Sequence, residues 1–150
     1  MLRQSFLTLA LLLLPMTPVI VPNYRPAIAA DNLPRANALG DYATRTSHRA
    51  WLVVDPDPKG LNCRWSSAMP ADWADPRVAP LLNSIDQWDV VRRFRKNTVV
   101  TANTAPAGFA QIFDGRNKPW LKINIDGKNR ICLIRANSKY VQPVTLATDP

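Results

Sequence analysis

The stretch 51–64 limits the fold of this chain more than any other, because two strand-like runs flank a proline-stiffened corner. The first run is Trp-Leu-Val-Val, and the corner after it holds two prolines, which lack the amide donor that a strand ladder needs. The second run, residues 61–65, alternates, so Leu61 and Cys63 are expected to face inward and their neighbours outward. We expect the two runs to form the founding hairpin of a small β domain.

The acidic residues point to the same fold class. All 11 are aspartate and none is glutamate, and the chain contains 14 prolines. Glutamate favours helices and proline interrupts them, so this composition argues against a helical protein. Together with the β-branched runs, it predicts an all-β fold.

The first 29 residues have the three parts of a signal peptide. Arg3 supplies the basic start, residues 6–21 are apolar, and Ala27 and Ala29 form a small-x-small cleavage site. A membrane-spanning helix is the competing interpretation, but the apolar run is shorter than the roughly 20 residues of a span, and two prolines interrupt it. No cysteine follows closely, so no lipoprotein anchor is predicted. We expect cleavage after Ala29 and a periplasmic or extracellular protein without a stable membrane anchor.

The chain after Ala29 is long enough for one domain and too short for two. Its formal charge is +6, because the first 29 residues carry two basic residues and no acid. This surplus favours contact with anionic polymers, and it is equally consistent with solubility alone, since most basic residues are scattered. The exception is the group Arg92, Arg93, Arg95 and Lys96. We expect a monomer.

The two cysteines, Cys63 and Cys132, are predicted to form one disulfide, as is usual in exported chains. The bridge would close a loop for which chain entropy suggests roughly 4 kcal/mol of stabilisation, an upper value. A reactive thiol is the alternative. It needs a basic partner, and the only histidine of the chain, His48, lies in a polar segment.

The remaining sequence predicts a leader, further strands and one insertion. Residues 30–50 are polar and lack apolar periodicity, which predicts a flexible leader. The β domain is expected to span residues 51–146, with a disordered tail at 147–150. Residues 66–83 are irregular, with a short helix expected to begin near Ala79. The other expected strands are 88–94 and 98–101, forming a hairpin around a turn at Lys96-Asn97, then 109–113, 120–125, 128–134 and 140–146.

Residues 120–134 contain the clearest hairpin, with Asp126-Gly127 as a two-residue turn. This turn pairs Ile125 with Lys128, and counting back pairs Ile123 with Arg130 and Leu121 with Cys132. Directly opposed residues share a face. The expected core face holds Leu121, Ile123, Ile125, Cys132 and Ile134, and the other face holds Trp120, Lys122, Asn124, Ile131 and Leu133. Cys132 then faces inward like Cys63, so the two can meet.

Several short motifs resemble those of the bacterial SH3-like domains found in exported proteins. Residues 60–64 (Gly-Leu-Asn-Cys-Arg) resemble the Leu-Asn-Val-Arg strand of that family, and residues 94–100 (Phe-Arg-Lys-Asn-Thr-Val-Val) resemble its Leu-x-Lys-Gly-Thr-x-Val hairpin. Residues 119–123 (Pro-Trp-Leu-Lys-Ile), with Asp126-Gly127, resemble its Trp-x-x-Val strand and turn. Residues 131–141 are similar to its closing segment.

In particular, the Val-Asp-Pro-Asp and Arg-Ala-Asn segments resemble those of exported cyanobacterial members of this family. The resemblance implies a small SH3-like barrel over residues 52–144. Residues 65–89 form an insertion about fifteen residues longer than the family's turn, with a short helix inside it. Since the family often uses loops near this place to bind cell-wall peptides or proline-rich ligands, its ligand specificity is not expected to carry over.

Tryptophans and arginines around the insertion are the candidate ligand-binding residues. They are Trp65, Trp73, Trp88, Trp120, Arg64, Arg92, Arg93 and Arg95. Tryptophan rings can stack on a sugar or proline ring while arginines meet phosphate or carboxylate. The alternative is that the insertion folds over one end of the barrel and its tryptophans form a small core. For Trp120, the alternative is packing beneath the leader.

No constellation in the sequence predicts catalysis, a cofactor or a metal. The serines lack a histidine at any plausible site, because His48 lies in the leader. Asp55 and Asp57 are interpreted as turn residues rather than as a metal or acid site. A zinc site needs three or four His or Cys ligands, and the chain has three such residues, two of them in the predicted bridge.

The sequence therefore predicts an exported, non-catalytic binding module for a cell-envelope component, either peptidoglycan or an acidic polysaccharide. The alternative is a protein-interaction or inhibitor module whose insertion docks on another exported protein. Binding of nucleic acid through the basic surplus is not expected in an exported protein.

Overall fold

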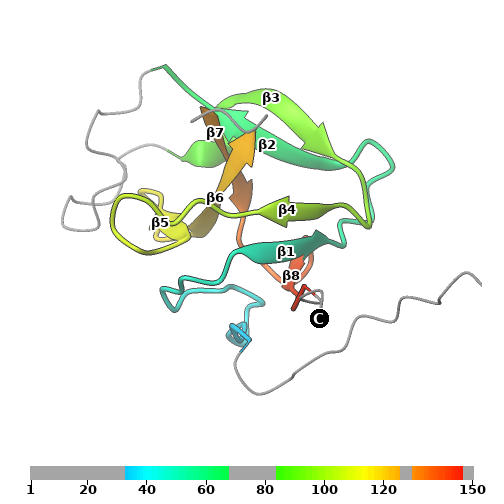
Figure 1. The fold of residues 1–150 in the computed structure, drawn as a ribbon. Helices are drawn as coiled ribbons and strands as arrows, with labels where there is room; N and C mark the ends of the chain where they lie inside the picture. Colours follow the sequence, from blue (N-terminus) through cyan, green and yellow to red (C-terminus); the bar gives the residue numbers. More distant parts are fainter. Residues whose placement is uncertain (1–32, 68–83, 126–129, 147–150) are drawn as a thin grey trace, which may run out of the picture.

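The computed structural model describes residues 33–67, 84–125 and 130–146. This part of the chain is all-β, as the composition predicted, with two antiparallel sheets (Figure 1). The predicted signal peptide, the helix expected near Ala79, Trp73 and the predicted tail lie outside the described residues. The strands are β1 (Ala50–Val53), β2 (Leu61–Trp65), β3 (Asp89–Phe94), β4 (Val99–Thr101), β5 (Gln111–Phe113), β6 (Pro119–Ile125), β7 (Arg130–Arg135) and β8 (Val141–Pro143), and the 3-10 turn η2 (Ile85–Gln87) precedes β3.

The strands divide between a three-stranded sheet in the order β4-β1-β8 and a five-stranded sheet in the order β3-β2-β7-β6-β5. An isolated bridge between Ala102 and Ile123 connects the two at the end of β4. In Figure 1 the smaller sheet lies beneath the larger one, and the chain passes between them at its corners. Their facing sides enclose the main core.

The corner after β1 sends the chain from one sheet to the other. β1 pairs with β4 and β8, whereas β2 pairs with β3 and β7. The founding hairpin predicted for residues 51–64 is therefore wrong, although both strands lie where they were expected. The prolines at 56 and 58 cannot donate to a ladder, and Gly60, with a φ of 86°, redirects the chain at the start of β2.

The turn at Lys96-Asn97 also joins the two sheets. Asn97 has the left-handed conformation, with a φ of 67°. The predicted hairpin of its flanking strands is wrong, because β3 pairs with β2 and β4 pairs with β1. The turn itself extends the β1 ladder: the Asn97 amide donates to the Val53 carbonyl at 2.8 Å, and the Val53 amide donates to the Thr98 carbonyl at 2.9 Å.

The β6–β7 hairpin is present, with a register that differs from the predicted one by two residues. Ile125 pairs with Arg130 and Ile123 with Cys132, so four residues rather than two separate the paired ends. A shift of two residues preserves which side chains share a face. The predicted core face is consequently confirmed even though the predicted pairs are wrong.

Two apolar clusters cover the two faces of the larger sheet. The main core lies between the sheets and includes Trp51, Leu61, Phe94, Val100, Leu121, Ile123, Ile134 and Val141. The second cluster lies on the opposite face and consists of Ile85, Ile112, Trp120 and Leu133, with Trp88 packed against it. The larger sheet is thus covered on both sides along β6 and β7.

The predicted disulfide is confirmed. Cys63 on β2 and Cys132 on β7 are bridged, 69 residues apart in sequence, and both are fully buried. Because β2 and β7 are neighbours in the larger sheet, the bridge fixes the contact between the first and last of its strands in sequence.

The segment before β1 packs on the domain, in contrast to the flexible leader that the sequence predicted. Tyr42 is part of the main core and its amide donates to the Ala136 carbonyl at 3.0 Å. The Thr46 carbonyl accepts the Ala110 amide at 2.8 Å. Polar sequence concealed these contacts, because apart from Tyr42 they are made by backbone groups and polar side chains, which give no apolar periodicity.

Candidate functional site

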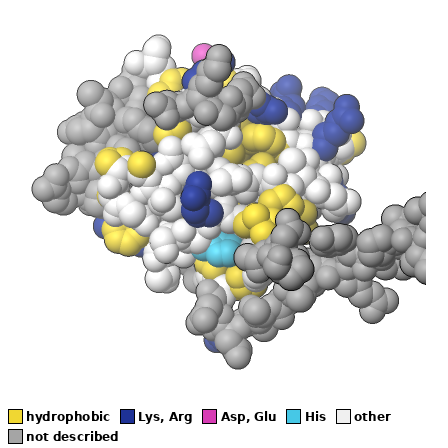
Figure 2. All heavy atoms as spheres, viewed as in Figure 1, with side chains coloured by type: hydrophobic (Ala, Val, Ile, Leu, Met, Phe, Trp, Pro, Cys, Tyr) yellow, Lys and Arg dark blue, Asp and Glu magenta, His cyan; other side chains and the backbone are white. Residues whose placement is uncertain are grey.

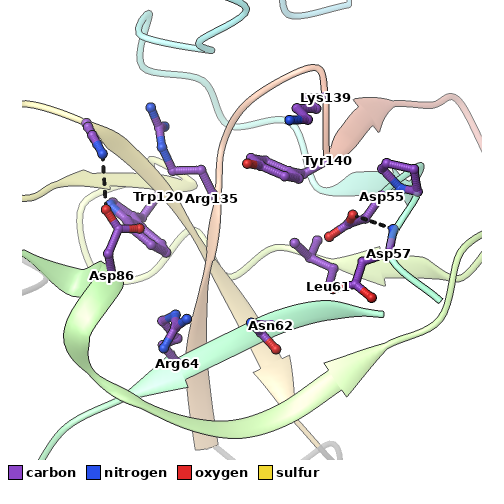
Figure 3. Close-up of a pocket in the computed structure, with 12 residues that line it drawn as sticks. Asp55, Asp57, Leu61, Asn62, Arg64, Asp86, Trp120, Arg135, Lys139 and Tyr140 are labelled. Atoms are coloured by element: carbon purple, nitrogen blue, oxygen red, sulfur yellow. Dashed lines mark hydrogen bonds and ion pairs between the residues drawn. The ribbon is translucent and has the colours of Figure 1, made fainter. Parts of the chain in front are cut away.

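A groove of about 570 Å³ lies where β2, β6 and β7 meet two of the connections between the sheets, β1–β2 and β7–β8. Its walls come from segments that are far apart in the chain (Figure 3). The lining residues are Asp55, Pro56, Asp57, Leu61, Asn62, Arg64, Asp86, Lys118, Trp120, Arg135, Lys139 and Tyr140. The groove therefore combines aromatic and aliphatic surface with charges of both signs.

The corner between β1 and β2 supplies one acidic end. Asp55 is only 8% exposed, and one of its carboxylate oxygens accepts the Asp57 amide at 3.0 Å. Asp57 in turn accepts the Lys59 amide at 2.8 Å. These bonds are the turn roles predicted for the two aspartates. They also hold both carboxylates against the groove, which the sequence did not predict.

Arg64 lies at the other end of the groove, where Figure 3 shows it with Asp86, Trp120 and Arg135. It projects from β2 on the side opposite the core, as the alternation predicted. Its guanidinium donates to the Trp88 carbonyl at 2.6 Å. This bond ties β2 to the end of the insertion and leaves further guanidinium donors available.

The other two cations at this end are paired with carboxylates. Lys118 contacts Asp86 at 3.1 Å, and both side chains are well exposed. Arg135 contacts Asp41 through both carboxylate oxygens, at 2.7 and 2.8 Å, with each side chain only 15% exposed. Both Asp41 oxygens accept from the same guanidinium nitrogen, and the pair is partly buried, so we expect it to be the stronger one.

The Arg-Ala-Asn segment, residues 135–137, supplies two of the side chains that contact Asp41 in this second pair. Besides Arg135, the Asn137 amide group donates to an Asp41 oxygen at 2.6 Å and to the Leu39 carbonyl at 3.0 Å. The Ala136 carbonyl accepts the Tyr42 amide. The signature thus holds the segment before β1 against the end of β7.

Trp120 forms part of the groove floor and is itself almost fully buried, at 2% exposure. Its indole nitrogen donates to Asp114 at 3.0 Å. The other Asp114 oxygen accepts the amides of Arg116 and Lys118, which closes the turn before β6. A ring held and covered in this way supports the groove and offers little surface for stacking on a ligand.

The remaining candidates separate into three places. Trp88 is half-buried against the second apolar cluster, which matches the small-core alternative. Trp65 is half-buried at the end of β2. Arg92, Arg93 and Arg95 are exposed on β3 and just after it, where Arg93 donates to Asn62 at 2.9 Å. Figure 2 shows Lys and Arg side chains gathered over this region.

Sequence reasoning missed most of the groove. Leu61, Asn62, Lys118, Arg135, Lys139 and Tyr140 were not candidates, and Asp55 and Asp57 were assigned to a turn. No period or motif marks these residues as a set, because they come from segments far apart in the chain. The only available signal was the pair of signature segments, Val-Asp-Pro-Asp and Arg-Ala-Asn, which turn out to lie on opposite walls.

One buried charge lies outside the groove. Lys122 on β6 is 1% exposed, and its amine donates to the Ala105 carbonyl at 2.7 Å. Burial lowers the pKa of Lys122 to about 8. No carboxylate of the described residues forms an ion pair with it.

Comparison of the chain with models of protein families and with curated proteins, and of its structure with solved structures, gives no match. Within the described ranges, no group of three or more His, Cys, Asp and Glu side chains is placed to hold a metal ion. The part of the chain that the structure describes contains no helix long and apolar enough to cross a membrane.

Proposed function

We propose that this protein is an exported, non-catalytic SH3-like module that binds a cell-envelope component in the groove. The groove carries the proposal: the half-buried ring of Tyr140, above the nearly buried Leu61 and Trp120, lies among charged side chains that converge from separate segments. Ligand sites in proteins are concave and use a few convergent polar groups to orient the ligand.

The arrangement of strands supports the SH3-like assignment. The strands that carry the family-like motifs, β2 and β6, are both neighbours of β7 in one sheet, and the third motif spans the turn from β3 to β4. Two sheets that exchange strands at tight corners are typical of small barrels built from antiparallel strands.

The disulfide supports export. A bridge between two fully buried cysteines, as in this core, persists in oxidising compartments and is rare in the cytosol. It agrees with the signal peptide predicted for the first 29 residues.

The surroundings of the histidine support a non-catalytic role. His48 contacts the Ala50 carbonyl at 2.8 Å and packs edge-on against Trp51, and it does not line the groove. The Ser84 hydroxyl lies 3.5 Å from Asp86 and has no bond to the histidine. Neither residue is placed as part of a nucleophile and base pair.

A pull-down with purified cell wall at low and high salt tests the proposal. The exported protein is expected to sediment with the wall, and Tyr140→Ala is expected to reduce this binding because the ring forms part of the groove. Thr101→Ala, an exposed change on β4 in the smaller sheet, is the matched control. Wild-type protein that stays in the supernatant at both salt concentrations would refute the proposal.

A protein partner is the second candidate function, favoured by one observation. β3 lies at the end of its sheet in the described part of the chain and exposes Val91 along with Arg93. Edge strands are common docking sites for extended segments of other proteins. Cross-linking in envelope extracts distinguishes the two candidates: a single cross-linked protein without wall binding favours the partner.

A further inference from the structure

The two ends of the groove carry opposite charges. Figure 3 shows Asp55 and Asp57 on one side, and Arg64 and Arg135 on the other, with the hydroxyl of Tyr140 pointing toward the middle. Some of these charges are paired within the protein, and the others are available to a ligand.

At the acidic end, both carboxylates are available. Each uses one oxygen as the acceptor in its turn, and a carboxylate can accept several hydrogen bonds. Among the described residues, none forms an ion pair with Asp55 or Asp57. Asp55 is also nearly buried, so an ammonium group that reached it would interact through a medium less polar than water.

At the basic end, Arg64 is the available cation. Lys118 and Arg135 have carboxylate partners, whereas the contact of Arg64 is a neutral backbone carbonyl. The half-buried guanidinium retains donors in a planar fork that suits a carboxylate.

Lys139 is the cation that lines the groove near its acidic end, whereas Lys59 on the same corner does not line it. Its amine lies 5.8 Å from the centre of the Tyr140 ring, and the residue is exposed. An exposed lysine at the rim is hydrated and screened by salt. It therefore neutralises Asp55 and Asp57 only partly.

The unpaired charges that line the groove consequently balance: the two cations, Arg64 and Lys139, are matched in number by the carboxylates of Asp55 and Asp57. A polyanion entering the groove would meet two carboxylates without a compensating excess of cations, which disfavours it. A dipolar ligand would satisfy both ends at once.

We propose that the groove selects a short peptide segment that carries both a free ammonium group and a free carboxylate, with the ammonium at Asp55 and the carboxylate at Arg64. This inference rests on the proposed function and specifies the part of an envelope component that the groove takes. Tyr140 contacts the segment between its charged ends.

Titration of the ¹⁵N-labelled protein with three probes tests this assignment: trialanine, N-acetyl-trialanine and trialanine amide. Trialanine is expected to shift resonances of the groove residues, and blocking either end is expected to weaken binding about tenfold. Asp55→Asn keeps the acceptor that closes the turn, and Arg64→Gln removes the charge. Lys96→Ala, an exposed change at the β3–β4 turn, is the control that should leave every affinity unchanged.

Each charge-removing variant is expected to weaken the binding of two of the three probes and to leave the third unchanged. A general loss of structure would weaken all three. Asp55→Asn should weaken the binding of trialanine and of its amide. It should leave the affinity for the N-acetyl form unchanged, because that form has no ammonium. Arg64→Gln should weaken the binding of trialanine and of the N-acetyl form, and leave the affinity for the amide unchanged. Arg64→Lys should retain part of the affinity for trialanine.

Two results overturn the inference. One is equal binding of all three probes, and the other is absence of binding by a protein that still sediments with cell wall, in which case the proposed function stands and only the ligand class is wrong. Failure of both the titration and the pull-down rejects the proposed function itself.

Discussion

At the scale of single residues, Lys122 has an environment that penalises its charged form. It is almost fully buried on β6 and its amine has one backbone acceptor. Burial lowers its pKa to about 8, against an ordinary value of 10.5. The residue is therefore expected to couple the stability of the fold to pH.

Between about pH 8 and pH 10.5, the unfolded chain keeps the Lys122 proton while the folded protein has lost it. Stability therefore rises with pH across this window, and a shift of this size limits the gain to about 3 kcal/mol. Urea unfolding between pH 7 and 9.5 should show the rise in wild type and a flat profile in Lys122→Met. The upper limit avoids Tyr42, whose pKa burial raises and which acts in the opposite direction at higher pH. An equal slope in both proteins would contradict the assignment.

Asp41 and Asp86 allow a comparison of two ion pairs in one protein. Asp41→Ala removes the partner of Arg135 and an acceptor of Asn137 in a partly buried site, so we expect a loss of about 3 kcal/mol. Lys118→Ala breaks a well-exposed pair with Asp86 and should cost less than about 1 kcal/mol. Urea denaturation of both variants measures the difference. Similar losses would show that burial does not set the strength of these pairs.

At the scale of elements, the corners that carry the chain between the sheets depend on particular backbone conformations. Gly60 has a φ of 86°, and a Cβ there would lie 2.6 Å from the Phe94 carbonyl oxygen. Gly108 has a φ of 80° but no atom within 4 Å of the same position. Substituting each glycine in turn therefore separates the free-energy cost of the left-handed conformation from that of the steric clash.

Gly60→Ala should therefore destabilise the protein more than Gly108→Ala. The conformation alone costs roughly 1 kcal/mol in each variant, and the clash with backbone adds to it only at Gly60. Thermal unfolding followed by circular dichroism measures both. Equal shifts in midpoint would indicate that the corner after β1 relaxes to accept the side chain.

The disulfide acts on the contact between β2 and β7. Replacing both Cys63 and Cys132 with alanine should cost roughly 2–4 kcal/mol, because the unfolded chain gains freedom over a long loop. Both sulfurs are fully buried, so alkylation of wild type should require reductant together with denaturant. Mass measurement after each treatment checks this, and two thiols reactive without reductant would refute the bridge.

At the scale of the whole molecule, the excess of positive charge and the groove occupy different places. The groove is close to neutral once its ion pairs are counted, whereas the exposed arginines of β3 continue into Arg95 and Lys96. A polyanion is therefore expected to contact the β3 region rather than the groove.

Retention on heparin checks this separation. Arg95→Ala/Lys96→Ala should elute at lower salt than wild type, because it removes two clustered charges. Arg49→Ala/Lys59→Ala removes the same charge from exposed positions elsewhere and should have a smaller effect. Equal elution of the two variants would mean that net charge, and not its position, controls binding.

The sequence allowed the strands to be placed but not their partners. Alternation of side chains identified the inward faces of β2, β6 and β7, since a strand repeats every two residues whatever it pairs with. The expected hairpins at residues 51–64 and 88–101 were wrong because a corner and a hairpin turn use the same residues. The sheet that the next strand joins is decided by the burial of apolar side chains from many segments at once, which no local pattern encodes.

The sequence by itself determined the all-β class, the cysteine pair and the turn roles of Asp55, Asp57 and Asn97, because these follow from local conformation, periodicity and the count of cysteines. Only the tertiary structure decided that β1 and β2 belong to different sheets and that the corner between them faces Arg64 and Tyr140 across a groove. The physical reason is that a groove is made by contacts between segments distant in sequence, and no local preference records them.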